Sequence, residues 1–132
     1  GVKLYADLLT LFDGLPQMDR SRAIKLADSC AGRGAEARCD LTLALIDLFL
    51  ARLARTGVAG PTSPEAGPNE AAPMLRLCPD SGSARHWAAL HDELGTRARH
   101  GRAVNLDPAA LILDTLMRIN GAAAARTVSP QP

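Results

Sequence analysis

The segment from Ala35 to Thr56 constrains the fold most, because it carries apolar residues at helical spacing on two separate faces. One face holds Leu45, Ile46, Phe49 and Leu53, and the other holds Leu41, Ala44, Leu48 and Ala51. Two apolar stripes at this period predict a helix that is packed on both sides. Gly57 follows Arg52, Arg55 and Thr56, and cations in the last turn with a glycine just beyond it are typical of a helix C-terminus. We therefore expect a long central helix that ends at Gly57.

The same periodicity predicts helices along the rest of the chain. The first is Val2–Phe12. The second is capped by Asp19 and stops at Gly32, with Ala23, Ile24, Ala27 and Cys30 inward. Further helices are Glu70–Leu77, a helix that begins after Ser83 and ends near His100, and Pro108–Asn120, which is capped by Asp107 and ended by Gly121. Alanine and leucine favour helix, whereas the aromatic residues that favour strands are scarce. The sequence thus predicts an all-α fold: a bundle of five to six helices in one domain over residues 1–121.

Two segments are predicted to lie outside the bundle. Residues 57–69 contain three prolines and three glycines with little to bury, so we expect a flexible surface loop there. Residues 122–132 are predicted to form a disordered tail. The chain begins within a helical pattern and shows no secretory leader, which suggests a domain from the end of a larger protein. Its longest apolar run falls well short of the ~20 residues of a membrane span, so we expect a cytoplasmic protein with no membrane contact.

No constellation for catalysis or metal binding is recognisable in the sequence. The three cysteines form no C-x-x-C pair, which favours reduced, partly buried thiols. His86 and His91 do not share a helical face, and the adjacent Asp92 and Glu93 point in different directions. Neither a nucleophile elbow nor a phosphate loop occurs. We expect no catalytic, metal or cofactor site and no small-molecule substrate, and therefore not an enzyme.

Two groups of residues could make contacts with other molecules. Arg97, Arg99 and Arg102 form the densest basic cluster, which could touch a phosphate backbone or an acidic partner, or could simply be a solvated helix end. In the final helix the inward stripe is Ala109, Ile112, Leu113, Leu116 and Ile119. The opposite face is the candidate subunit interface, and it consists of Leu111, Asp114, Thr115 and Arg118. Asp114 and Arg118 lie one turn apart and are expected to form an intrahelical ion pair.

Two segments carry a resemblance to a known family. GRGAEAR at 32–38 leads into LTLALIDLF at 41–49, and residues 97–111 read RARHGRAVNLDPAAL. Both resemble the C-terminal region of the delta-prime subunits of bacterial DNA polymerase III, and the similarity runs over most of residues 2–120. The second segment is the more specific, because clamp-loader subunits commonly end in an Asn-containing stretch followed by an apolar terminal helix.

The resemblance implies a collar domain, a helical bundle that joins clamp-loader subunits into a ring during DNA replication. Its partners would be the delta and gamma/tau type subunits in the bacterial cytoplasm. ATP binding and DNA contact belong mainly to the AAA+ modules of that family, and its Ser-Arg-Cys motif and zinc module have no counterpart here. What the resemblance transfers is assembly without direct DNA contact. The alternative is a helical nucleic-acid-binding or general protein-interaction module that uses the Arg97–Arg102 cluster.

Overall fold

The computed structural model describes residues 1–61 and 64–128, and within these ranges every regular element is helical. The elements are α1 (Val2–Asp13), α2 (Arg20–Asp28), α3 (Glu36–Ala59), α4 (Ala71–Leu77), α5 (Ser81–Ala103) and α6 (Pro108–Val128). The predicted all-α bundle with a long central helix is confirmed, since α3 is the longest helix and contacts α1, α4, α5 and α6. None of the described helices is long and apolar enough to cross a membrane.

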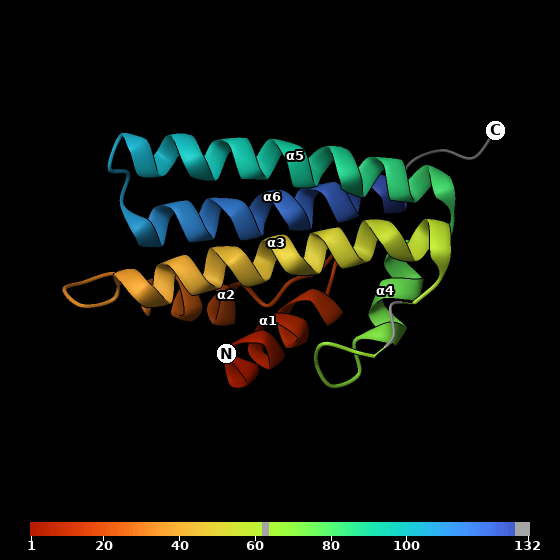
Figure 1. Ribbon diagram of the computed structural model, residues 1–132, viewed down its shortest axis with the longest axis horizontal. Coiled ribbons are helices and arrows are strands. Elements are labelled where there is room, and N and C mark those ends of the chain that lie inside the picture. The colour runs from red at the N-terminus through yellow and green to blue at the C-terminus, as the bar shows by residue number, and fades with distance from the viewer. Residues whose placement is uncertain (62–63, 129–132) are drawn as a thin grey trace.

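The three long helices run side by side along the long axis of the molecule (Figure 1). Helix α5 is antiparallel to both α3 and α6, and it packs against each of them. The shorter helices α1, α2 and α4 lie on the other side of α3 from α5, and α2 also contacts α6. The turn between α5 and α6 therefore lies at one end of the bundle.

The predicted apolar stripes build the core. Phe12 of α1 stacks on Phe49 of α3 with ring centroids 4.3 Å apart, and both rings are fully buried. Trp87 of α5 is also buried, and its Nε1 donates a hydrogen bond to the carbonyl of Leu77. In α2 the prediction was wrong for Ile24, which is exposed, because Leu26 fills the inward position instead.

Helix α3 does not end at Gly57 as predicted but continues to Ala59. A Cβ atom at residue 57 would overlap the carbonyl oxygen of Asp80 and would lie 2.6 Å from Cys78 Sγ. Glycine at this position therefore permits close approach of the α5 N-terminus, rather than terminating the helix. The actual C-cap is Gly60, which adopts a left-handed φ of 79°.

The second apolar face of α3 is not packed, contrary to the prediction of a helix covered on both sides. Leu41 and Leu48 each keep 39% of their surface exposed, and Ala44 and Ala51 are also exposed. The buried face is instead formed by Cys39, Thr42, Ile46, Phe49, Leu50, Leu53 and Thr56. One long apolar stripe of the central helix thus faces outward.

The predicted loop and tail are both shorter than expected. Residues 57–59 belong to α3, and Gly67 lies against Tyr5 and Leu9 of α1. Helix α6 continues through Gly121 to Val128, since Ala123 is buried and extends the inward stripe by one turn beyond Ile119. The tail prediction is therefore wrong for residues 122–128. The rest of the predicted tail, 129–132, lies outside the described residues, and so do residues 62 and 63 of the predicted loop.

Candidate functional site

Helix α5 ends in a C-terminal capping motif, in which Asn105 occupies the left-handed position that glycine usually takes. Asn105 has a left-handed φ of 57°. The N–H of Leu106 bonds to the Gly101 carbonyl at 2.8 Å, and the N–H of Asn105 bonds to the Arg102 carbonyl at 3.2 Å. These are the two hydrogen bonds of a Schellman motif, and asparagine tolerates its left-handed residue. Residues 104 and 105 therefore form a tight turn, and Leu106 follows it with half of its surface exposed.

This turn encloses a groove of about 380 Å³ between the end of α5 and the start of α6, which we call the α5–α6 groove. Helix α6 begins beside it, because the Asp107 carboxylate caps the helix by accepting a hydrogen bond from the N–H of Ala110 at 3.1 Å. Leu106 keeps 52% of its surface exposed next to the groove, and the neighbouring Val104 keeps 51%. The groove is lined by Arg97, His100, Leu106, Asp107, Ala110, Leu111 and Asp114.

Asp114 lies at the centre of the charges on the rim of this groove. Its Oδ2 accepts hydrogen bonds from Arg97 of α5 at 3.1 Å and from Arg118 at 3.0 Å. Partial burial raises the pKa of Asp114, but the two guanidinium groups outweigh this effect and hold the pKa below its ordinary value. The predicted Asp114–Arg118 pair is confirmed, and Arg97 joins α5 to it.

The structure divides the predicted interface residues into two pairs. Leu111 and Thr115 are buried, and the Thr115 hydroxyl donates a hydrogen bond to the Leu111 carbonyl within the same helix. Thr115 is therefore unavailable as a surface contact, while Leu111 forms part of the groove wall. Asp114 and Arg118 are accessible. The expectation of four residues on one outward face was wrong because α5 covers part of that face.

The predicted basic cluster is dispersed by its ion pairs. Arg97 pairs with Asp114 of α6, whereas Arg102 pairs with Asp40 of α3 at 2.6 Å. Arg99 donates a hydrogen bond to the Thr96 hydroxyl at 3.3 Å. Two of the three guanidinium groups therefore pair with carboxylates on different helices.

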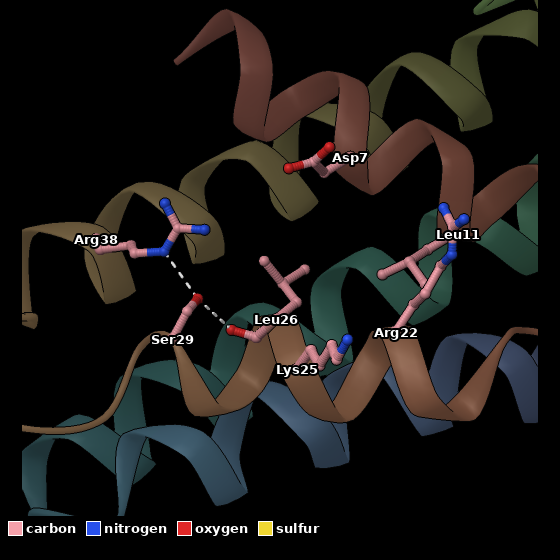
Figure 2. A pocket seen from close by; sticks show the side chains of 7 residues that line it. All are labelled: Asp7, Leu11, Arg22, Lys25, Leu26, Ser29 and Arg38. Carbon is pink, nitrogen blue, oxygen red and sulfur yellow. Dashed lines mark hydrogen bonds between the residues drawn. The ribbon is translucent and has the colours of Figure 1, made fainter.

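A second cavity, of about 300 Å³, lies where α1 and α2 meet the start of α3 (Figure 2). Three cations line it, Arg22, Lys25 and Arg38, with Asp7 on α1 facing them. Arg38 Nε donates a hydrogen bond to the Ser29 hydroxyl at 2.8 Å, and that hydroxyl donates to the Leu26 carbonyl at 2.6 Å. Sequence reasoning missed this basic pocket because its residues come from three separate helices.

The most extensive buried polar network joins α1, α3 and the segment before α4. Arg52 holds the Glu70 carboxylate through two hydrogen bonds, from Nε at 2.9 Å and from Nη2 at 2.6 Å. The Tyr5 hydroxyl donates to Glu70 Oε2 at 2.5 Å, and the N–H of Ala66 donates to Oε1 at 3.0 Å. Arg52 Nη2 also donates to the Pro64 carbonyl. This enclosed network fixes the 64–70 segment against the bundle.

The network makes stability depend on pH at both extremes. Burial raises the pKa of Glu70, but hydrogen bonds from Arg52, Tyr5 and Ala66 outweigh it, so this pKa is lowered in the folded state. We expect the free energy of unfolding to fall as pH drops below about 4, where the unfolded carboxylate takes up protons first. Burial, together with Glu70, raises the pKa of Tyr5 well above its ordinary value. Stability should therefore also fall above about pH 10, where the unfolded tyrosine ionises first.

Urea denaturation across the acid and alkaline ranges measures both effects. A Tyr5→Phe variant should lose part of the alkaline fall and keep the acid one. Equal alkaline slopes in the two proteins would contradict the assignment to Tyr5.

The remaining candidate ligands are placed apart from one another. Within the described ranges, no group of three or more His, Cys, Asp or Glu side chains is positioned to hold a metal ion. The three cysteines are free and buried, and burial raises the pKa of Cys39 and Cys78. His91 Nε2 lies 2.8 Å from Asp47 Oδ1. His86 contacts the Ala122 carbonyl instead.

The chain matches no protein-family model, no curated protein and no solved structure.

Proposed function

We propose that the chain is a subunit-assembly domain of a DNA polymerase III clamp loader, which docks to neighbouring loader subunits through the α5–α6 groove. The observation that carries this proposal is an open, largely apolar groove at the end of a helical bundle, flanked by exposed aliphatic side chains. Exposed aliphatic residues gathered beside a concave surface are typical of protein-docking sites.

The position of the groove in the sequence supports this proposal. Arg97, His100, Leu106, Asp107, Ala110 and Leu111 line it and all lie within residues 97–111, the segment that most resembles the delta-prime family. Asp114, the remaining lining residue, was among the residues predicted for a subunit interface. The site and the resemblance thus coincide in one short stretch of chain.

The charges around the groove favour a protein partner over a polyanion. The rim contains two carboxylates, Asp107 and Asp114, beside Arg97 and His100, and Asp114 is already paired with two arginines. Asp107 and Asp114 balance the charges of Arg97 and Arg118, so the rim has no net positive charge to attract a phosphate backbone. An apolar side chain of a neighbouring subunit would instead enter the centre of the groove and leave the polar rim hydrated.

Replacing Leu106 with lysine tests the site. Because Leu106 is half exposed, this variant should fold normally but weaken binding to delta and gamma/tau type subunits by about tenfold or more, as expected for loss of an apolar anchor. Size-exclusion chromatography with light scattering, followed by calorimetry, measures complex formation and affinity. The matched control is Leu75→Lys in α4, which is 46% exposed and lies outside the groove.

If the unaltered chain is folded and fails to bind any loader subunit, the proposal is wrong. Binding that both lysine variants leave unchanged would retain an assembly function but move it away from this groove.

The alternative, a nucleic-acid-binding module, depends on the cluster of Arg97, Arg99 and Arg102. It requires affinity for DNA that falls steeply with salt concentration. The pairing of Arg97 with Asp114 and of Arg102 with Asp40 speaks against it. A gel-shift titration at low salt distinguishes the two functions, because only the alternative predicts a shift of DNA.

A further inference from the structure

The outward face of α3 carries a regular heptad pattern, separate from the α5–α6 groove. Its residues follow one another at alternating intervals of four and three positions, and all of them are exposed. We call this face the α3 seam; it consists of Ala37, Leu41, Ala44, Leu48, Ala51, Arg55 and Val58. The buried face of the same helix is used by the core, so the seam is not needed for folding.

This spacing specifies the kind of partner. Apolar residues that alternate at intervals of three and four positions face a second helix that crosses at a small angle, as in coiled coils. The seam spans about 32 Å at the rise of an α-helix, long enough for a sustained contact. Its larger residues alternate with alanines, which let a second backbone approach closely while the leucines interlock.

The seam can pair with a second copy of itself in the antiparallel direction, centred on Leu48. Leu48 then faces its own counterpart, Ala44 faces Ala51, Ala37 faces Val58, and Leu41 faces Arg55. In an antiparallel second copy the alanines therefore face alanine or valine, and the methylene stem of Arg55 can cover Leu41 while its guanidinium group stays hydrated.

The charges on the seam select the same arrangement. Arg55 is exposed and makes no ion pair within the described residues. In the antiparallel pairing Arg55 lies beside Asp40 of the second copy, and the twofold axis repeats this contact. The Asp40 carboxylate is half exposed, although it also pairs with Arg102 of its own chain. A parallel pairing would instead bring the two Arg55 side chains together, which is destabilising. Asp47, near the twofold axis, is held against His91 of its own chain.

We propose that the α3 seam pairs with the same seam of a second copy of this chain, antiparallel and about a twofold axis at Leu48. A single helix pair buries less surface than a standard protein–protein interface, so the association is reversible, with a dissociation constant in roughly the micromolar range or above.

Sedimentation equilibrium of the full chain between low micromolar and millimolar concentration tests the pairing. The unaltered chain is expected to dimerise, and a Leu41→Lys, Leu48→Lys double variant is expected to remain monomeric. Both leucines are partly exposed, so circular dichroism should confirm that the variant is folded. Leu75→Lys on α4 is the apolar control and should dimerise like the unaltered chain.

A second pair of variants tests the orientation. Arg55→Glu should weaken dimerisation several-fold at low salt, because a carboxylate at position 55 would face Asp40 of the second copy. Arg85→Glu, an exposed position on α5, makes the same change in net charge and should have no such effect.

A folded chain that is monomeric at every concentration overturns the proposal, and so does a dimer that the leucine variants leave intact. If the chain is monomeric alone while loader subunits bind it, self-pairing is wrong and the proposed function stands. If the chain dimerises and no loader subunit binds it, self-pairing stands and the proposed function is wrong.

Discussion

Replacing Glu70 with glutamine is expected to destabilise the protein by about 3–5 kcal/mol, the range found when one partner of a buried ion pair is removed. The side chain of Glu70 is only 2% exposed, and that of Arg52 is 15% exposed. Glutamine preserves the shape but leaves the Arg52 guanidinium without an opposing charge. It also weakens the hydrogen bond from Tyr5, which is made to a carboxylate oxygen. Urea denaturation at neutral pH measures the change.

The control for this prediction is Glu93→Gln, an exposed position on α5. It removes the same charge and should change the free energy of unfolding by less than about 0.5 kcal/mol. A double variant, Glu70→Gln with Arg52→Met, should recover part of the loss, because no buried charge then lacks a partner. A loss in Glu70→Gln as small as that of the exposed control would show that water reaches Arg52 freely and that the network contributes little.

The second large effect concerns two glycines that lie inside helices. Gly57→Ala is expected to destabilise the protein by about 1–3 kcal/mol, the usual range for overpacking. Its new methyl group would overlap the Asp80 carbonyl oxygen, and this clash should exceed the helix-propensity gain of about 1 kcal/mol. Gly121→Ala has nothing within 4 Å of the new Cβ atom, so it should stabilise the protein by about 0.5–1 kcal/mol.

Thermal and urea unfolding of the two alanine variants should therefore give shifts of opposite sign. Stabilisation of both variants would mean that α3 and the start of α5 do not approach as closely as the contacts at Gly57 require. Destabilisation of Gly121→Ala would mean that α6 ends at Asn120, as the sequence pattern predicts.

The sequence predicts the helices well because each has a strong apolar stripe, as in α1 and the part of α6 before Asn120. Helix ends are predicted less well. The pattern predicts Gly57 and Gly121 as terminators, since a glycine after basic or polar residues commonly ends a helix. A glycine that allows close packing looks the same in a sequence as one that ends a helix. At Gly57 only the positions of Asp80 and Cys78 in the structure distinguish the packing role from the terminating role.

Polar sites are harder to predict because their members are distant in the chain. Tyr5, Arg52 and Glu70 belong to three segments, and a single glutamate in a proline-rich stretch gives no sign that it is buried. The three arginines at 97–102 show the converse error. They are close in sequence, but Arg97 and Arg102 pair with different helices. Within the candidate interface, Asp114 is accessible and Thr115 is buried, because Thr115 lies between α3 and the middle of α5.

The most direct measurement is hydrogen exchange of the chain, alone and with the delta and gamma/tau type subunits. Docking in the α5–α6 groove predicts slower exchange of backbone amides from Arg102 to Leu111 in the complex. It predicts the same exchange in α4 in both states. A stable complex in which the 102–111 amides exchange at an unchanged rate would contradict docking at this groove.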